Sequence, residues 1–513
     1  MASLELLATT SALVAGSASR LAKIRALAQC LASIPQGEVE TAVHYLSGSL
    51  PQGRIGIGHR TLHAVADEKP AAVPTLGIGS VDAAIQAVSA SAGAGSTARR
   101  AELLAALFSA ATAPEQDFLL RLLAGELRQG ALDGVMTEAI AAAAKLPPAL
   151  IRRALMYGPE LGRLAAVALT AGAAGLQQFQ LQVFHPVVPM LAQTAQDTAE
   201  ALRTLAGPVQ FDWKMDGGRI QVHKQGTEVR IYTRALNEIG AAIPEVLAAV
   251  RELPAATLIL DGEALAYASD GRPHPFQITM RRFGRSLNVQ AMLEKLPMRA
   301  YFFDCLLLDG EVLTERPLSE RMAALARAVP DSQRMPQLVT ADEAQATAFY
   351  EAALAAGHEG VMAKSLASTY EAGNRGAQWF KIKRSHTLDL VILAAEWGNG
   401  RREGLLSNLH LGALDTATGE YVMLGKTFKG LTDAMLAWQT RELLAREIRR
   451  DSLTVYVRTE LVVEIAFSDL QTSTRYAGGI ALRLARVKRF RIDKRADEAD
   501  TMEAIRRIQA GQG

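Results

Sequence analysis

The sequence predicts a multidomain fold in three parts. These are an all-α part over residues 1–180, a mixed α/β (α+β) part over residues 181–387, and a small C-terminal β-barrel of the OB-fold kind over residues 388–513. Three observations predict this. The 513 residues correspond to roughly three domains at about 150 residues each. The spacing of apolar residues changes from helical to alternating near residue 181, and the predicted strands become short and closely spaced after residue 388.

The first part is rich in alanine and leucine at helical spacing. One apolar stripe of a helix is formed by Leu21, Ile24, Ala28 and Leu31. Pro114 suits the first turn of another helix, in which Phe118 and Leu122 lie on the same face. Pro147 and Pro148 end a third helix, and no stretch alternates as a strand does, so we expect helices only.

The second part alternates apolar and polar residues in short runs. The apolar positions of three predicted strands are Val209, Phe211 and Trp213, then Ile220 and Val222, then Val229 and Ile231. A turn at Gln225-Gly226 separates the second strand from the third. Longer strands are predicted over residues 257–267 and 298–308, with helices over residues 319–329 and 342–356, which together indicate a mixed α/β part.

The third part consists of short predicted strands. They cover residues 388–394, 409–414, 420–424 and 460–467. One helix is predicted near residues 433–449, and a basic stretch covers residues 475–495. About 125 residues of this kind suit a small β-barrel such as an OB-fold.

Composition and charge exclude several classes of protein. Lys and Arg number 55 against 53 Asp and Glu, so any binding to nucleic acid must rest on local basic patches. Cys30 and Cys305 form no CxxC pair, which excludes a disulfide framework and a four-cysteine zinc site and fits a reducing cytoplasm. The longest uncharged apolar run, residues 164–176, is shorter than the about 20 residues of a membrane span. The N-terminus also lacks the pattern of a signal peptide, so we expect a soluble, cytoplasmic protein with no membrane contact.

Two apparent motifs do not meet the geometry that they need. Residues 424–427 resemble the end of a Walker A loop, but Gly419 lies one position too far from Gly425 to complete it. His358-Glu359 begins a zinc-protease motif, but Met362 stands where the second histidine ligand is required. Neither motif predicts a site.

The strongest local signal is Lys214-Met215-Asp216-Gly217-Gly218-Arg219, which follows one predicted strand and precedes another. Period-2 geometry places Asp212 and Lys214 on one face of the first strand. A lysine at the edge of a sheet, followed by glycines that let a phosphate approach the backbone, is suited to covalent catalysis. The alternative interpretation is a strand-ending lysine before a turn.

This pattern resembles the KxDGxR element of the covalent nucleotidyltransferases, which include ATP-dependent DNA ligases, RNA ligases and mRNA-capping guanylyltransferases. The resemblance continues downstream in the order of that superfamily. The further elements are Thr233-Arg234, Asp261-Gly262-Glu263, Phe302-Phe303-Asp304, residues 359–364, residues 379–383 and residues 491–494. Over the whole chain, the sequence is similar to the three-domain bacterial ATP-dependent DNA ligases of the ligase B kind.

The resemblance implies that Lys214 attacks the α-phosphorus of ATP and becomes a lysyl–AMP adduct. A free lysine, with a pKa of about 10.4, is mostly protonated at neutral pH. We therefore expect burial and neighbouring cations to favour the neutral amine, the cations being Arg219, Lys381, Lys383 and a bound metal ion. Lys381 and Lys383 lie two residues apart on a predicted strand, so both would face the α-phosphate while the residues between them face the core.

For the nucleotide, the resemblance implies that Phe303 stacks on adenine and that Asp212 reads the adenine amino group where the family usually has glutamate. It implies that Arg234 binds the nucleotide or the nick phosphate, that Arg219 binds the 5′-phosphate or the ribose, and that Arg375 contacts ATP.

For the metal and the outer phosphates, the resemblance implies that Glu263 contacts the ribose or a metal ion and that Glu359 is a second metal carboxylate. Mg²⁺, with Mn²⁺ as a substitute, suits such a pair together with phosphate oxygens. Arg491 and Lys494, in the RxDK element of the mobile barrel, would reach the β- and γ-phosphates of ATP and then swing away.

The helical part resembles the DNA-binding domain of replicative-type DNA ligases. The match covers residues 123–130 and Val135-Met136. Its glycines expose backbone N–H groups that can meet DNA phosphates, with Arg128 in the minor groove. NAD-dependent ligases are excluded by the missing cysteine cluster.

We therefore expect an ATP-dependent DNA ligase that seals 3′-OH/5′-phosphate nicks in duplex DNA through lysyl–AMP and DNA–adenylate, in replication, recombination and repair. We expect a monomer whose three domains encircle the nicked DNA. One alternative is an RNA ligase or capping-type enzyme with the same first step, and ligation of DNA against RNA nicks separates it. The other is a non-catalytic scaffold that binds duplex DNA, which labelled ATP would not modify.

Overall fold

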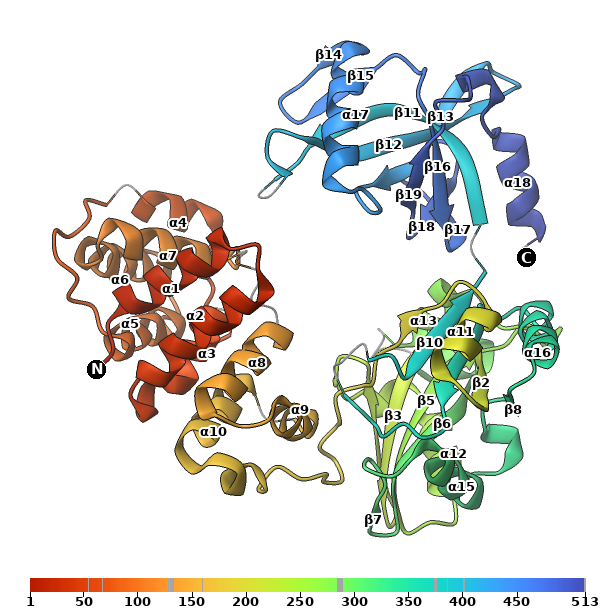
Figure 1. Ribbon diagram of the computed structural model, residues 1–513, viewed down its shortest axis with the longest axis horizontal. Coiled ribbons are helices and arrows are strands. Elements are labelled where there is room, and N and C mark those ends of the chain that lie inside the picture. Colours follow the sequence, from red (N-terminus) through yellow and green to blue (C-terminus); the bar gives the residue numbers. More distant parts are fainter. Residues whose placement is uncertain are drawn as a thin grey trace.

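The computed structural model describes residues 1–53, 55–66, 68–127, 129, 133–158, 160–283, 289–372, 376–384, 386–399 and 402–511. Figure 1 shows these residues as three parts: a group of helices, a central part with two sheets, and a C-terminal part built on a larger sheet. No helix within these described ranges has the length and apolar character needed to cross a membrane. The multidomain fold class expected from the sequence is confirmed.

The N-terminal part, red to orange in Figure 1, is a packed group of helices. They are α1 (Leu4–Gly16), α2 (Arg20–Ser33), α3 (Val39–Leu46), α4 (His59–Ala66), α5 (Ile78–Ala90), α6 (Ser96–Ala110), α7 (Ala113–Leu123), α8 (Asp133–Ala144), α9 (Pro148–Met156) and α10 (Leu161–Leu176). The helix predicted around Pro114 is α7, with that proline in its first turn and Phe118 and Leu122 buried. Pro148 begins α9.

The predicted apolar stripe of α2 is partly wrong. Ile24, Leu27 and Leu31 form its buried face, whereas Leu21 is 65% exposed. Leu21 lies in the first turn, where the side chains of Arg20 and Lys23 bond to the backbone oxygens of Gly134 and Gln129. These polar contacts join the first turn to the backbone at Gln129 and Gly134, and Leu21 is not part of this contact.

The central part contains two five-stranded sheets. In the first sheet the order is β1 (Gln193–Thr194), β10 (Trp379–Lys383), β9 (Gly360–Ser365), β2 (Val209–Lys214) and β8 (Gln337–Thr340). In the second sheet the order is β4 (Glu228–Thr233), β3 (Gly218–Gln225), β5 (Thr257–Ala266), β6 (Met298–Leu308) and β7 (Glu311–Val312). The chain therefore passes from one sheet to the other between Lys214 and Gly218.

Helices cover the outer faces of these sheets, while apolar residues fill the space between them. The helices are α11 (Thr198–Leu205), α12 (Pro244–Arg251), α13 (Phe276–Phe283), α14 (Val289–Lys295), α15 (Leu318–Ala328) and α16 (Glu343–Ala355). Ile259 and Leu306 of the second sheet share a buried cluster with Trp379 of the first, so the two sheets pack on each other directly.

The C-terminal part, blue in Figure 1, is a seven-stranded sheet with a separate hairpin. The sheet contains β11 (His386–Trp397), β12 (Leu406–Asp415), β13 (Glu420–Thr427), β14 (Glu447–Arg450), β15 (Thr454–Val457), β16 (Val462–Phe467) and β19 (Arg486–Phe490); the hairpin is β17 (Asp469–Thr472) with β18 (Ile480–Arg483). β11 pairs with β12 along one edge and with both β15 and β16 along the other, with bulges after Ile392 and Glu396, so the sheet curls into a half-barrel.

The helices of this part differ from the prediction in two respects. The predicted helix over residues 433–449 is α17 (Asp433–Ala445), and the chain after it forms β14 instead of a further helical turn. A second helix, α18 (Met502–Gly511), was not predicted, although Met502 and Ile505 pack into the core of the sheet.

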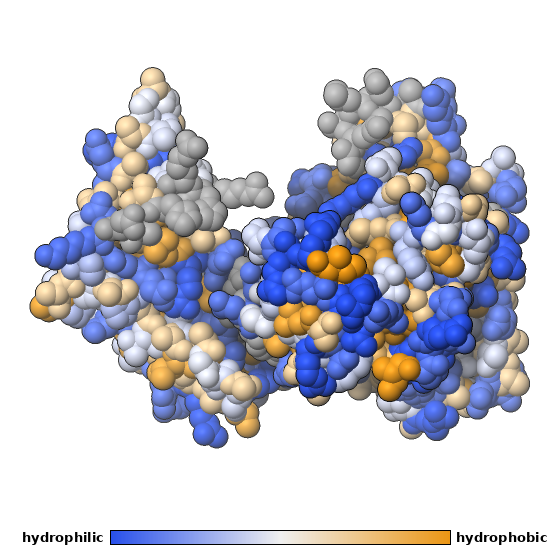
Figure 2. Space-filling model, turned by 90° about the horizontal axis from the view of Figure 1, so that it is seen from above, coloured by the Kyte–Doolittle hydropathy of each residue, from blue (hydrophilic) through white to orange (hydrophobic). Residues whose placement is uncertain are grey.

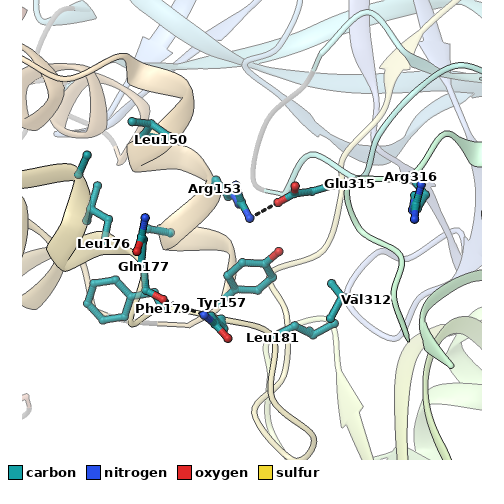
Figure 3. Close-up of a pocket in the computed structure, with 13 residues that line it drawn as sticks. Leu150, Arg153, Tyr157, Leu176, Gln177, Phe179, Leu181, Val312, Glu315 and Arg316 are labelled. Atoms are coloured by element: carbon teal, nitrogen blue, oxygen red, sulfur yellow. Dashed lines mark hydrogen bonds and ion pairs between the residues drawn. The ribbon is translucent and has the colours of Figure 1, made fainter. Parts of the chain in front are cut away.

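A few polar contacts join the three parts. Tyr157, just after α9, has its hydroxyl oxygen 2.9 Å from Thr314 Oγ1 of the central part, and Arg153 pairs with Glu315 beside a pocket of about 820 Å³ (Figure 3). Seen from above, most of the C-terminal part is covered by hydrophilic residues, with hydrophobic ones in small separate patches, and the surface is hollowed between it and the N-terminal helices (Figure 2).

Candidate active site

Lys214 lies at the end of β2, where the two central sheets meet. β2 is an inner strand between β9 and β8, but its pairing with β8 stops at Asp212, so Lys214 pairs with β9 alone. Backbone pairing places Lys214 opposite Gly360, and the N–H of Glu359 donates to the Lys214 carbonyl oxygen at 3.0 Å. The start of β9 therefore brings a carboxylate next to the lysine.

The two glycines after Lys214 are required by packing. A Cβ atom at Gly217 would lie 2.5 Å from the carbonyl oxygen of Ala264 on β5, and one at Gly218 would overlap the ring of Phe283. The sequence interpretation, in which these glycines admit a phosphate, misses this constraint. Their absence of side chains lets the chain cross from β2 to β3 against the second sheet.

Glu359 joins two lysines from neighbouring strands. Its Oε2 lies 2.5 Å from Lys214 Nζ and 2.8 Å from Lys383 Nζ on β10. The side chains of Lys214, Glu359 and Lys383 are 22%, 15% and 23% exposed, so these three charged groups are largely shielded from water. On β10, Phe380 and Ile382 are buried while Lys381 and Lys383 are partly exposed, as the alternating pattern predicted.

Carboxylates determine the protonation of Lys214. Burial acts to lower the pKa of Lys214, but the charge and hydrogen bond of Glu359, with the charges of Glu263 and Asp216, raise it above its ordinary value. The lysine is therefore an ammonium in this state. The expectation that cations keep the amine neutral is wrong here, because its nearest charged neighbours are acids.

The three carboxyl groups near Lys214 differ in the direction of their pKa shifts. Burial raises the pKa of Glu263 to about 7, with Lys214 and Arg219 acting against this and Asp216 and Glu359 adding to it. Burial would also raise the pKa of Glu359, but the two lysines beside it hold it at about 2. Burial and the charge of Glu359 raise the pKa of Asp216, while its ion pair with Arg483 opposes them. The three carboxyl groups thus act on one another's charge around Lys214, and a cation near them would lower that repulsion.

Arg219 is anchored on the second sheet. Its Nη2 donates to Asp261 Oδ2 and its Nη1 to the Met190 carbonyl oxygen, both at 2.7 Å. Its guanidinium carbon lies 5.5 Å from the centre of the Phe303 ring. Arg219 Nε has no hydrogen-bond acceptor within the described part of the chain, which leaves a donor for a ligand oxygen.

The carboxylate of Asp212 is already engaged. Its Oδ2 lies 2.5 Å from Lys364 Nζ on β9, and its Oδ1 accepts a hydrogen bond of 2.8 Å from Gln210. Lys364 Nζ also lies 4.6 Å from the centre of the Phe303 ring. Lys364 is the last residue of the motif at residues 359–364. That motif could have pointed to Lys364, but the sequence analysis assigned a role only to Glu359.

The remaining predicted residues are not joined to Lys214 by any contact within the described ranges. Arg234 is exposed in the turn after β4. Arg491 Nη1 and Lys494 Nζ bind Asp389 Oδ2 of β11, at 2.7 and 2.6 Å. Arg375 and Arg128 lie outside the described residues.

Arg483 reaches the site from the C-terminal part and was missed. Its Nη1 lies 2.8 Å from Asp216 Oδ2, and its guanidinium carbon lies 4.7 Å from the centre of the Phe276 ring. The basic stretch that contains Arg483 was the only sequence signal for it, since its partner lies more than 260 residues earlier.

Comparisons with known proteins match three stretches of the chain, one within each of the three parts. Residues 60–141 match the family model described as DNA ligase N terminus, residues 189–383 match ATP dependent DNA ligase domain, and residues 402–494 match ATP dependent DNA ligase C terminal region. A probable DNA ligase of Anaeromyxobacter sp. is 55% identical over 508 residues, which cover 99% of this chain and 98% of that one.

Other relatives and a solved structure agree with this. Probable DNA ligases of Sorangium cellulosum and Mycolicibacterium gilvum are 52% and 54% identical, covering 98% of this chain and 95% and 98% of their own. The solved structure named Pmar-Lig_Pre. superposes with a TM-score of 0.62 over 95% of this chain and 99% of that one. At 17% identity that likeness concerns the fold alone.

Proposed function

Because the chain belongs to the family of ATP-dependent DNA ligases, we propose that Lys214 is the residue that receives the adenylyl group from ATP. Enzymes of this family join DNA ends through an adenylate intermediate and serve replication, recombination and repair. The observation that carries the proposal is the position of Lys214, bonded through Glu359 to Lys383 at the junction of the two sheets. Family membership also favours this function over a capping-type enzyme or a non-catalytic scaffold.

In the first step, the Lys214 amine attacks the α-phosphorus of ATP, the bond to pyrophosphate breaks, and a phosphoramidate forms. The ammonium, which is ion-paired with Glu359, must first lose a proton to water, because Glu359 with a pKa of about 2 does not keep it. Lys381 and Lys383 would bind the phosphate oxygens as negative charge develops there. In the later steps AMP passes to the 5′-phosphate of a DNA nick, and the 3′-hydroxyl displaces it.

Glu263 and Glu359 would hold Mg²⁺, or Mn²⁺ in its place. These residues suit a cation because burial and the nearby carboxylates raise the pKa of Glu263 to about 7. A bound cation would stabilise the ionised form of Glu263 and lower that pKa. When bound, the metal supplies positive charge near the phosphates and offsets the carboxylate charges that raise the pKa of Lys214.

The nucleotide would lie against the second sheet. Phe303 would stack on adenine, and Arg219 would use its free Nε–H on a ribose or 5′-phosphate oxygen. Contact between Asp212 and adenine requires sharing the carboxylate with Lys364, because both oxygens already have partners. Arg234 and Arg375 would bind the outer parts of the nucleotide or the nick phosphate.

The outer parts would bind DNA around this centre. We assign residues 1–180 to an all-α DNA-binding domain, residues 181–387 to the adenylation domain and residues 388–513 to an OB-fold. The curled sheet supports the last assignment. Arg491 and Lys494 would leave Asp389 to reach the β- and γ-phosphates. A monomer in the cytoplasm would close its three domains around nicked duplex DNA.

The test is covalent labelling of the full chain with ATP labelled at the α-phosphate, in the presence of Mg²⁺. The wild type should carry a label that survives alkali and is lost in acid, and Lys214→Ala should carry none. Lys426→Ala is the matched control, because it removes a lysine from a comparable pair with Glu396 in the C-terminal sheet and should label normally. Labelling of Lys214→Ala would place the nucleophile elsewhere.

A further inference from the structure

The hydroxyl group of Tyr370 lies behind Arg219 and makes three hydrogen bonds. It donates to Asp261 Oδ2 at 2.5 Å, and it accepts from the Met190 N–H at 3.1 Å and from Arg219 Nη2 at 3.4 Å. A phenol has one proton to donate and two lone pairs to accept with, so this hydroxyl is fully used.

The same atoms hold Arg219. Asp261 Oδ2 receives both the Tyr370 hydroxyl and Arg219 Nη2, while the carbonyl oxygen of Met190 receives Arg219 Nη1. Asp261 is fully buried and Tyr370 is 3% exposed, so water does not compete for these bonds. The direction of the guanidinium group, and of its unpaired Nε–H, therefore depends on Tyr370 as well as on Asp261.

Tyr370 is itself fixed from three sides. Its ring packs edge-on against Trp379 of β10, with ring centres 6.3 Å apart and planes at 88°. Its backbone N–H donates to the Thr314 carbonyl oxygen at 2.8 Å, and the guanidinium of buried Arg321 lies 5.9 Å from its ring centre. Tyr370 thus links β10, which carries Lys381 and Lys383, to the strands that carry Arg219 and Asp261.

We infer that Tyr370 is a positioning residue for ligation, which aims Arg219 at the substrate by fixing the acceptors of its guanidinium group. The inference rests on the proposed function, in which Arg219 contacts the nucleotide or the 5′-phosphate. In this inference the Tyr370 hydroxyl positions Arg219, whereas the Tyr370 ring only packs against its neighbours. A variant that removes the hydroxyl and keeps the ring therefore tests the inference.

Tyr370→Phe removes the hydroxyl and keeps the ring. The Met190 N–H then loses its acceptor, and Asp261 Oδ2 keeps only Arg219, with Gln221 near its other oxygen. We expect the rate of nick sealing to fall by about 10- to 100-fold, the range that follows from misplacing a substrate-binding group by up to about 1 Å. The loss should appear at whichever step is slowed most by Arg219→Ala.

The experiment measures lysine adenylylation, adenylyl transfer to the nick and sealing of a pre-adenylated nick separately. The variants are Tyr370→Phe, Arg219→Ala, the double variant and Asp261→Asn. A positioning role predicts that all slow the same step and that the double variant is no slower than Arg219→Ala. Tyr45→Phe, which removes a buried hydroxyl bonded to Asp82 Oδ1 at 3.2 Å in the N-terminal helices, is the control and should leave all steps unchanged.

Several results of this experiment would overturn the inference. They are a double variant in which the two rate losses multiply, a Tyr370→Phe loss at a different step from Arg219→Ala, and a Tyr370→Phe protein in which every step keeps its wild-type rate, whether or not its melting temperature falls. An Arg219→Ala protein with wild-type rates would also overturn it. None of these resembles failure of the proposed nucleophile, which would show as labelling that persists in Lys214→Ala.

Discussion

Buried polar side chains on β3 constrain one another residue by residue. His223 Nδ1 accepts a hydrogen bond of 2.9 Å from the Phe184 N–H, so its proton is on Nε2, which lies 2.9 Å from Gln221 Oε1. Gln221 Nε2 in turn approaches Asp261 Oδ1 at 3.4 Å. The ring is fully buried, and burial lowers the pKa of His223 to about 3. This neutral histidine therefore helps to keep Asp261, the anchor of Arg219, in place.

A pH dependence of stability follows from His223. In the unfolded chain it takes up a proton near pH 6.5, whereas the folded protein resists protonation until about pH 3. The contribution of His223 to the free energy of unfolding is thus fully present above pH 6.5. It falls by about 1.4 kcal/mol for each pH unit below that, down to about pH 3. Urea unfolding of the central part between pH 7 and 5 should show this slope, and His223→Gln should reduce it. Equal slopes in both proteins would contradict the assignment.

The chain order of the motifs predicted part of the site but not its pairings. Lys214, Glu359 and Lys383 were expected near one another, and they are in direct contact. The bond between Asp212 and Lys364 could not be read from the sequence, because it depends on the register of β2 against β9, strands about 150 residues apart. The same is true of Tyr370 and Asp261, whose separation of 109 residues is bridged only by the fold.

At the scale of elements, the connection from β2 to β3 has the strictest geometry. A Cβ at Gly217 would stand 2.5 Å from the Ala264 carbonyl oxygen, which is backbone of β5 and cannot rotate away. Gly217→Ala must therefore shift the connection and move Lys214 relative to Glu359. We expect labelling from ATP to slow by about 100-fold, as misplacement of a reacting group by about 1 Å implies.

The matched control for Gly217→Ala is Gly16→Ala at the end of α1, where an added Cβ meets nothing within 4 Å. It should label at the wild-type rate. A Gly217→Ala protein that labels as fast as this control would show that the connection can yield without moving Lys214.

Alternating patterns predicted the strands better than helical spacing predicted helix ends. The strand predicted over residues 298–308 coincides with β6 (Met298–Leu308). The helix predicted to reach residue 449 ends at Ala445, because the residues after it form a hairpin with β15, and this strand pairing overrides the local helical pattern. The spacing of Met502, Ile505 and Ile508 was a signal for α18 that was not used.

At the scale of the whole molecule, the C-terminal part meets the central part through polar contacts. Arg483 pairs with Asp216, and Gln277 Nε2 donates to Gln471 Oε1 at 2.8 Å. Contacts of this kind suit parts that move relative to each other. Arg491 and Lys494 are bonded to Asp389 within the C-terminal part, so the reach that we propose for them requires these bonds to break.

Arg483 is the charged contact that holds the C-terminal part against the connection from β2 to β3, which follows Lys214. The side chains of Arg483 and Asp216 are only 19% and 27% exposed, and the guanidinium group also stacks on Phe276. Arg483→Ala removes a charge-assisted hydrogen bond worth about 1.5 kcal/mol, so labelling of Lys214 from ATP should slow by about tenfold. Sealing of a pre-adenylated nick, which needs a different arrangement of the parts, should slow less.

Arg489→Ala separates this contact from a general loss of basic charge. Arg489 lies on β19 of the same part and pairs with Glu464, with 66% of its side chain exposed, and no contact joins it to the connection from β2 to β3 within the described residues. If the contact with Asp216 closes the enzyme on ATP, labelling falls in Arg483→Ala alone, because only that variant frees the C-terminal part. Equal losses in the two variants would mean that charge, and not the Arg483–Asp216 contact, governs the first step.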